Sequence, residues 1–244
     1  MVTKIMQIKE KSSCILCGST QNKVSFPYSI KFSESEFFYK RCSSCKCVFI
    51  NPIPSDDDFE KIYQNENYHE EHYVDVDLSE YEASVGLLSK YISNDDAKVL
   101  DYGCGYGHFL KALQNNKFQA EGLEFDESAS IKAEHYSGCK VYPVNKLINI
   151  EKNSFNVLHL GDVLEHLPNP LQTLKKLIGI LDTNGIIFIE GPLETNPSPV
   201  YWAAKLFGLI KKIFLQKENY GKPTHLIRVD ADTQKEFILK INSR

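Results

Sequence analysis

The sequence predicts an α/β protein with a doubly wound, mostly parallel sheet and a small cysteine-bearing module in front of it. From residue 97 onward, short apolar runs alternate with helix-like segments, as in a parallel sheet covered by helices. A loop with three glycines at alternate positions follows the first of these runs. Two Cys-x2-Cys pairs lie near the N-terminus, and this spacing is typical of a zinc-ribbon-like module.

The bulk composition is that of an ordinary globular protein. The 244 residues are 42% hydrophobic and 25% charged, which suits one core and a small second module. The net charge of −4 gives no general attraction to nucleic acid, so we expect no nucleic-acid partner. We also expect a cytoplasmic location, because the sequence shows no signal peptide, no apolar run of about 18 residues and an odd cysteine count that suits a reducing compartment.

The first two cysteine pairs predict a metal site. Cys14 and Cys17 are followed, after 24 residues, by Cys42 and Cys45. Each pair can supply two thiolates from a tight turn, so the four fit one tetrahedral, structural Zn2+ with no open position for water. Cys47 leaves a Cys45/Cys47 alternative, and the interpretation without a metal is two disulfides or four unrelated thiols. A module of about 40 residues hardly holds a core without such a cross-link.

The chain is expected to have three parts. Residues 1–50 form the zinc-binding module, residues 51–96 a linker with a lead-in helix, and residues 97–244 the main domain. Pro52 and Pro54 mark the end of the first part, because proline cannot continue a central strand.

The linker carries a helix-start signal. Ser79 and Glu82 have the spacing of a capping box, which predicts the lead-in helix over residues 80–92. His69 and His72 lie one helical turn apart, but the acids around them match no metal-ligand set, so we interpret them as surface residues.

The main domain alternates strands and helices. Its expected strands are apolar or β-branched runs, and its expected helices are amphipathic. The strands are expected at residues 98–102, 118–126, 139–144, 154–160 and 185–191, and the intervening helices at 108–116, 127–136 and 170–181. Ligands of such sheets bind at the carboxyl ends of the strands, where Asp101 and the glycine loop lie.

The glycine loop excludes two common nucleotide motifs. Gly103, Gly105 and Gly107 follow Asp101 in the pattern Asp-x-Gly-x-Gly-x-Gly. A dinucleotide fingerprint would place its third glycine at His108, and the lysine of a phosphate-binding P-loop is also absent. The loop therefore suits a ligand that approaches the backbone closely and combines an amino-acid part with a nucleoside part.

Residues 97–192 resemble the class I S-adenosylmethionine-dependent methyltransferases, which have a Rossmann-like fold. Four segments carry the resemblance in order: "VLDYGCGYG", "GLEFD", "FNVLHLGDVLEHLPNP" and "GIIFIEGP". The resemblance implies S-adenosylmethionine as the cofactor. It also implies that Glu124, which lies 19 residues beyond Gly105, binds the two ribose hydroxyls.

The resemblance further implies how the rest of the cofactor is held. The glycine loop would lie against the methionine part, and Asp101 would receive its ammonium. Phe125 either flanks the adenine or belongs to the core, and Asn145 is a candidate for the adenine edge. The implied cofactor-binding residues are Asp101, Gly103, Gly105, Gly107, Glu124, Phe125, Asn145, Gly161 and Asp162, the last two beside the sulfonium.

A zinc module before such a domain resembles bacterial methyltransferases of surface-polysaccharide pathways, including sugar C-methyltransferases. This implies a small-molecule acceptor, such as a sugar, and a histidine as general base: His166 or His225, with Glu165 beside the first. In the sugar enzymes a Glu precedes the second histidine, whereas Thr224 stands here, so C- and O-methylation both stay open. The alternative function is a catalytically inactive, methyltransferase-like zinc-binding scaffold.

Residues 200–215 are mostly apolar, with Lys205 and Lys212 seven positions apart. The run is too short to span a bilayer, which leaves three interpretations: a lid, a homodimer surface or a peripheral membrane helix. After a final expected helix at residues 232–244, the two further strands of the family do not follow, so the chain is either a fragment or a naturally short copy.

Overall fold

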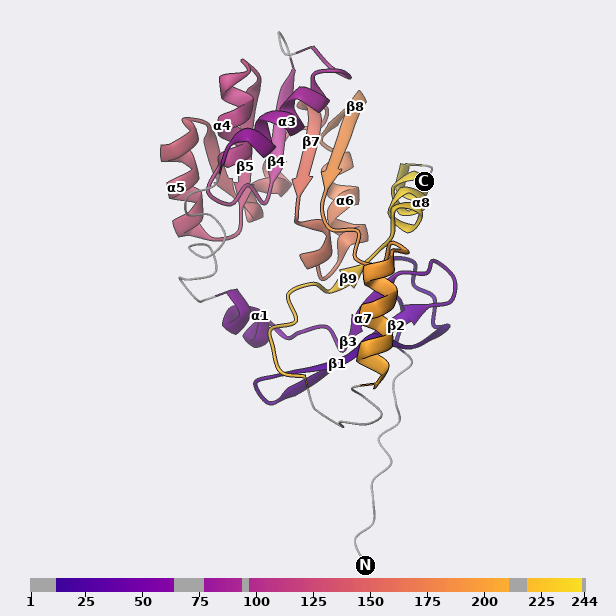
Figure 1. The fold of residues 1–244 in the computed structure, drawn as a ribbon. Helices are drawn as coiled ribbons and strands as arrows, with labels where there is room; N and C mark the ends of the chain where they lie inside the picture. Colours follow the sequence, from indigo (N-terminus) through magenta and orange to yellow (C-terminus); the bar gives the residue numbers. More distant parts are fainter. Residues whose placement is uncertain (1–11, 64–76, 94–96, 211–218, 243–244) are drawn as a thin grey trace, which may run out of the picture. The chain divides into compact units, whose positions relative to one another are not determined.

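The computed structural model describes residues 12–63, 77–93, 97–210 and 219–242. Figure 1 shows their secondary structure along the chain. By contacts the chain divides into two compact units, one of residues 56–192 and one that combines residues 1–55 with residues 193–244. The domain boundaries predicted after residues 50 and 96 stay predictions, and the units are described separately below. His69 and His72 lie outside the described residues.

The unit of residues 56–192 is built on a five-stranded parallel sheet with the order β6-β5-β4-β7-β8. Its strands are β4 (Lys98–Tyr102), β5 (Gln119–Glu124), β6 (Lys140–Pro143), β7 (Phe155–Gly161) and β8 (Leu181–Glu190). The chain runs outward from β4 in one direction and then returns to its other side, which makes β4 the switch point of the sheet. The predicted doubly wound parallel sheet is confirmed.

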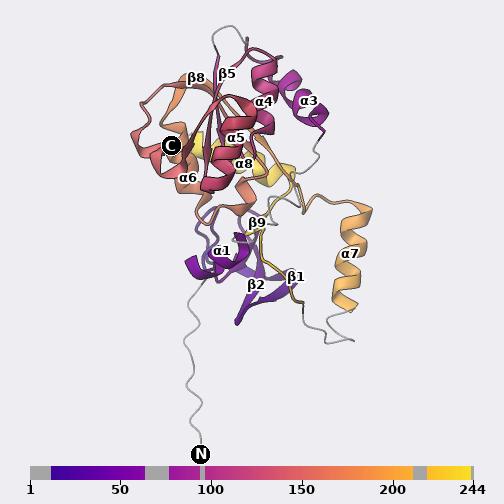
Figure 2. The same ribbon diagram turned by 90° about the vertical axis from the view of Figure 1, so that its left-hand side faces the viewer.

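The described part of this unit also contains helices. They are α1 (Asp56–Tyr63), α3 (Ser79–Leu88), α4 (His108–Asn115), α5 (Glu127–Ser137) and α6 (Pro170–Ile178), with 3-10 turns η1 (Val144–Asn149) and η2 (Leu164–His166). Figure 2 shows α4 and α5 side by side in front of the strands. Val85 of α3 and Phe109 and Leu113 of α4 are buried in one cluster with Val99 and Val157 of the sheet. This packing places the start of α4, and the loop before it, at the carboxyl ends of the strands.

The lead-in helix differs from the prediction in two ways. It ends at Leu88 rather than at residue 92, and its N-cap is Leu78, which makes no side-chain cap hydrogen bond. Ser79 donates to Asp77 instead, from its N–H at 2.9 Å and its hydroxyl at 2.7 Å. Glu82 accepts hydrogen bonds from side-chain amides of α4 and the residue after it. The capping box is therefore wrong, because both of its side chains have better partners outside the first turn.

The second unit has a four-stranded antiparallel sheet with the order β1-β2-β3-β9. Its elements are β1 (Asn22–Phe32), β2 (Ser35–Cys42), β3 (Val48–Asn51), α7 (Pro199–Ile210), β9 (Ile227–Arg228) and α8 (Ala231–Asn242). The two-residue strand β9 thus extends the sheet of the N-terminal module. By contacts the final helix, α8, groups with this unit.

Candidate functional site

The glycine loop joins β4 to α4 in a conformation that favours glycine. Gly103, Gly105 and Gly107 have φ values of 78°, 53° and 83°. A Cβ on Gly103 would lie 2.7 Å from a methyl of Val163, and one on Gly107 would lie 3.0 Å from the backbone of Ala133. Side chains at these two positions would therefore be strained by the backbone and crowded by neighbours. The loop follows β4 closely after Asp101, whose side chain is buried.

Glu124 is held by three backbone N–H groups. Its Oε2 accepts from Gly105 at 2.8 Å, and its Oε1 accepts from Phe125 at 2.7 Å and from Asp126 at 3.1 Å. Burial raises the pKa of Glu124, although these N–H groups favour the carboxylate. Two donors occupy both lone-pair directions of Oε1, so Oε2 is the oxygen with an acceptor direction left for a ligand hydroxyl.

The remaining predicted cofactor residues also follow strand ends. Phe125 is 64% exposed, with its ring edge-on to Tyr102 at 5.9 Å, so the interpretation of Phe125 as a core residue is wrong. Asn145 is exposed in η1, after β6. Gly161 ends β7, and the exposed Asp162 follows it with a φ of 50°. Because the strands are parallel, these residues and the glycine loop lie at the same edge of the sheet.

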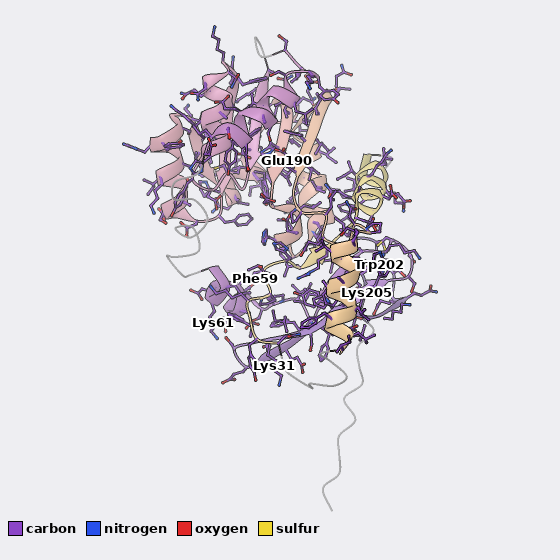
Figure 3. All side chains as sticks on the ribbon, viewed as in Figure 1. Lys31, Phe59, Lys61, Glu190, Trp202 and Lys205 are labelled. Carbon is purple, nitrogen blue, oxygen red and sulfur yellow. The ribbon has the colours of Figure 1, made fainter. Side chains whose placement is uncertain are left out.

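A buried histidine that the sequence analysis missed lies at this edge. His159 of β7 is hydrogen-bonded through Nδ1 to Asp101 Oδ1 at 2.7 Å and through Nε2 to Glu190 Oε2 at 3.2 Å. Ser84 of α3 donates to Glu190 Oε1 at 2.7 Å. Figure 3 labels Glu190 at the end of β8. The sequence did contain a signal for this group. Asp101 lies near the end of β4 and Glu190 at the end of β8, and the strand between them, β7, carries His159.

The predicted catalytic residues fall in both units. Glu165 is buried and His166 half-buried in η2, directly after β7. His225 lies in the other unit, two residues before β9, where its Nδ1 is 3.0 Å from Glu194 Oε2. Arg228 contacts the second oxygen of Glu194 at 3.2 Å. Thr224 stands where the sugar enzymes have a glutamate, and here the carboxylate beside His225 comes from Glu194 instead. Sequence reasoning missed this partner.

The four predicted zinc ligands form one cluster. The sulfur atoms of Cys14, Cys17, Cys42 and Cys45 all lie within 4.8 Å of one another, with Cys14–Cys45 and Cys17–Cys42 distances of 3.6 Å. Zn–S bonds of about 2.3 Å in a tetrahedron give sulfur–sulfur edges of about 3.8 Å. The cysteines are free thiols rather than disulfides. The donor set and its spacing therefore fit a zinc ion.

The surroundings of this cluster favour the thiolate at Cys42 and oppose ionisation of Cys14, Cys17 and Cys45. Burial opposes the ionisation of Cys42, but backbone N–H groups of Cys45 and Ser44 lower its pKa to about 7. The hydrogen bond with Cys14 and burial raise the pKa of Cys45, because packed thiols resist ionising together without a cation. Cys47 is buried outside the cluster and donates to the Val48 carbonyl at 3.3 Å. Of the Cys45/Cys47 alternatives, the structure brings Cys45 to the other three.

The order of the parallel sheet, a glycine loop after β4 and an N–H-anchored acid at the end of β5 together define the fold of the class I S-adenosylmethionine-dependent methyltransferases. The chain belongs to the methyltransferase domain family, whose family model matches residues 71–220. The matched segment contains every residue predicted to bind the cofactor.

Relatives and solved structures agree with this family. The chain is 25% identical over 145 residues to a ubiquinone biosynthesis O-methyltransferase of Idiomarina loihiensis, covering 54% of the chain and 58% of the relative. The Bordetella avium protein of the same name is 26% identical over 140 residues, covering 53% of the chain and 58% of the relative. The chain thus matches less than two thirds of the length of these relatives.

Two solved structures share the fold at low identity. A SAM-dependent methyltransferase from Archaeoglobus fulgidus aligns with a TM-score of 0.50 and 21% identity, covering 68% of each chain. The CurJ carbon methyltransferase aligns with a TM-score of 0.50 and 14% identity, covering 76% of this chain and 54% of that one.

Proposed function

We propose that the protein transfers a methyl group from S-adenosylmethionine to a small-molecule acceptor, with a sugar or a sugar-containing intermediate as the expected class. The observation that carries the proposal is the hydrogen bond from Gly105 to Glu124, which joins the glycine loop to the ribose-binding acid in one preformed site. The named relatives are O-methyltransferases of ubiquinone biosynthesis, and they favour transfer to oxygen. The sugar class rests on the cluster of Cys14, Cys17, Cys42 and Cys45, which we propose binds a structural Zn2+.

The test is calorimetry with S-adenosylmethionine, followed by transfer of a labelled methyl group to a panel of nucleotide-linked sugars and phenols. Cofactor binding with label in a sugar supports the whole proposal, and label in a phenol overturns the sugar class. A folded protein that binds no cofactor would instead be the methyltransferase-like scaffold.

In the proposed site, S-adenosylmethionine supplies an electrophilic methyl group, and the chain positions it. The backbone of the glycine loop would hold the methionine part, Asp101 would receive the ammonium, and Glu124 Oε2 would accept a hydrogen bond from a ribose hydroxyl. Phe125 is exposed at the strand edge, where its ring can cover the adenine. Gly161 and Asp162 follow β7, and we assign them to the sulfonium.

Replacing Glu124 by alanine is expected to weaken cofactor binding by about 1.5–3 kcal/mol, the usual worth of a hydrogen bond to a charged group. The substitution also releases the N–H of Gly105 from its partner, so the loop loses part of its support. Calorimetry with S-adenosylmethionine measures the effect. Glu121→Gln is the matched control, because Glu121 lies on the same strand but pairs with Lys98 at 2.8 Å. Equal affinities for the two variants would contradict the assigned site.

We propose His166 and His225 as candidates for the general base, with Glu165 holding the loop beside the first. The contact between Glu194 and His225 Nδ1 supports the second candidate. A carboxylate at Nδ1 fixes the tautomer with the proton on Nδ1, and this leaves Nε2 as the basic atom. His225 and Glu194 then form the orienting pair that the local sequence, with Thr224, lacks.

We also propose that α7 is a docking surface for an anionic lipid membrane. Within the described residues, none of the helices is long and apolar enough to cross a bilayer. The helix packs Gly208 close to Phe26 of β1 and turns its large apolar side chains outward. The exposed ones are Val200, Trp202, Leu206, Phe207, Leu209 and Ile210.

The charge of this segment selects an anionic surface as the partner. Residues 195–217 contain four lysines and no acid, in a chain whose net charge is −4. Lys205 lies 4.9 Å from the ring of Trp202, and both are labelled on α7 in Figure 3. Tryptophan beside lysine on an apolar helix suits the boundary between headgroups and acyl chains. The part of the segment at 211–218 lies outside the described residues.

Sedimentation with vesicles tests this surface. The protein is expected to bind vesicles that contain phosphatidylglycerol and not vesicles of phosphatidylcholine alone. Phe207→Asp should weaken this binding roughly 10- to 100-fold, because burying such a side chain contributes about 1.5–3 kcal/mol. Ile131→Asp, at an exposed isoleucine of α5, should leave it unchanged. Dimerisation that Phe207→Asp abolishes, without vesicle binding, would show that a second copy covers α7 instead.

A further inference from the structure

His159 occupies the centre of a charged chain across three neighbouring strands. In the sheet, Asp101 of β4 pairs directly with His159 of β7, and Glu190 of β8 pairs with Gly161, two residues further along β7. Side chains two residues apart on a strand share one face. The register therefore brings both carboxylates to the same side of the sheet as the imidazole, one at each ring nitrogen.

The geometry favours a doubly protonated ring. Each ring nitrogen lies within hydrogen-bond distance of a carboxylate oxygen, and a carboxylate only accepts, so both contacts are satisfied when both nitrogens donate. Burial opposes the charged form, but the charges and hydrogen bonds of Asp101 and Glu190 raise the pKa of His159 to about 9. Burial likewise opposes ionisation of Glu190, yet the hydrogen bonds from His159 and Ser84 lower its pKa.

Neighbouring elements hold this arrangement in place. The ring of Phe109, from α4, stacks on His159 with centroids 3.8 Å apart, and Phe188 of β8 lies 5.4 Å away. From α3, Ser84 donates to Glu190, and Tyr81 is near enough to both carboxylates to be affected by them. Burial and these carboxylates raise the pKa of Tyr81, so its phenol stays neutral. Together, the carboxylates of Asp101 and Glu190 and the imidazolium of His159 have a net charge of −1.

We propose that His159 is a positioning residue for the cofactor, an imidazolium that holds Asp101 and Glu190 together and leaves one net negative charge for the ammonium of S-adenosylmethionine. The inference rests on the proposed cofactor site. His159 engages Oδ1 of Asp101, and we assign Oδ2 to the ammonium. Without the imidazolium the two acids repel each other in a buried site, so one would rotate away or take up a proton. Either change removes a fixed acceptor from the methionine end.

Charge rescue tests the proposal with S-adenosylhomocysteine, which has the same methionine end but is not consumed. At pH 7.5, His159→Leu is expected to weaken binding roughly 10- to 100-fold. The double variant His159→Leu with Glu190→Gln restores the net charge of −1, and its affinity should return to within a few-fold of the wild type. If His159 served only to pack against Phe109, the second substitution would bring no recovery, and that result would overturn the proposal.

A measurement on the unaltered protein covers the case in which His159→Leu does not fold. With histidines labelled at Cε1, the NMR signal of His159 should titrate near pH 9, and S-adenosylhomocysteine should shift it. A titration near pH 6.5, the ordinary histidine value, would contradict the imidazolium. A signal that titrates near pH 9 in a protein that binds no S-adenosylhomocysteine would support the imidazolium between Asp101 and Glu190 but contradict the proposed cofactor site. The two failures are therefore distinguishable.

Discussion

Cys42→Ser is expected to lose the zinc ion that we propose for the cysteine cluster and to unfold the cysteine-bearing module, while the parallel sheet stays folded. Zinc binding contributes about 10–16 kcal/mol of apparent folding free energy in small zinc-finger peptides. A module of this size has no other source of folding free energy large enough to replace the binding lost with one of four thiolates. Cys42 ends β2, and its Sγ lies 3.6 Å from that of Cys17, so the change also disturbs the first cysteine pair. Elemental analysis should fall from one zinc per chain to none.

Cys47→Ser is the matched control for this experiment. Cys47 is as buried as Cys42 and belongs to the same module, but it lies outside the sulfur cluster. It should keep the zinc, and limited proteolysis should leave its N-terminal module intact. Zinc retained after Cys42→Ser, or lost after Cys47→Ser, would show that the ligand set is wrong. Calorimetry with S-adenosylmethionine on both variants reports whether the parallel sheet has survived.

His225→Gln is expected to lower turnover by roughly 10²–10⁴, the usual contribution of a positioned proton transfer, if His225 is the base. Cofactor affinity should stay within a few-fold, because His225 is not among the residues assigned to the cofactor. The pH profile separates this role from a structural one. A neutral imidazole is needed to take the proton, so wild-type activity falls as the pH is lowered, and the variant should lose that limb.

Two further variants complete the comparison. Glu194→Gln should lower turnover in the same direction but less, because it removes the charge that orients His225 Nδ1 and keeps the shape. His166→Gln tests the other candidate, and His135→Gln, at an exposed histidine of α5, is the control. Full turnover in both His166→Gln and His225→Gln would show that the proton is removed elsewhere or that proximity alone suffices.

The parallel sheet and the cofactor loop could be predicted from the sequence because their signals are local. Each strand is a short apolar run, and the turn after β4 needs positive φ values that select Gly103 and Gly107. The position of Glu124 could also be predicted, because the alternation of strands and helices in the sequence makes Glu124 the end of β5. The grouping of the four cysteines could also be predicted, since each pair comes from one tight turn. In all these cases, neighbours in sequence carry the information.

The tertiary structure alone decided the partners that come from distant parts of the chain. Strand β9, only Ile227–Arg228, has no recognisable pattern and exists because it pairs with β3. Glu194 reaches His225 across 31 positions, and this contact depends on how two irregular segments lie in one unit. His159 meets two acids because the register of three strands aligns them. Local sequence determines where strands and turns form, but register and long-range pairing depend on packing energy summed over the whole unit, which no short stretch encodes.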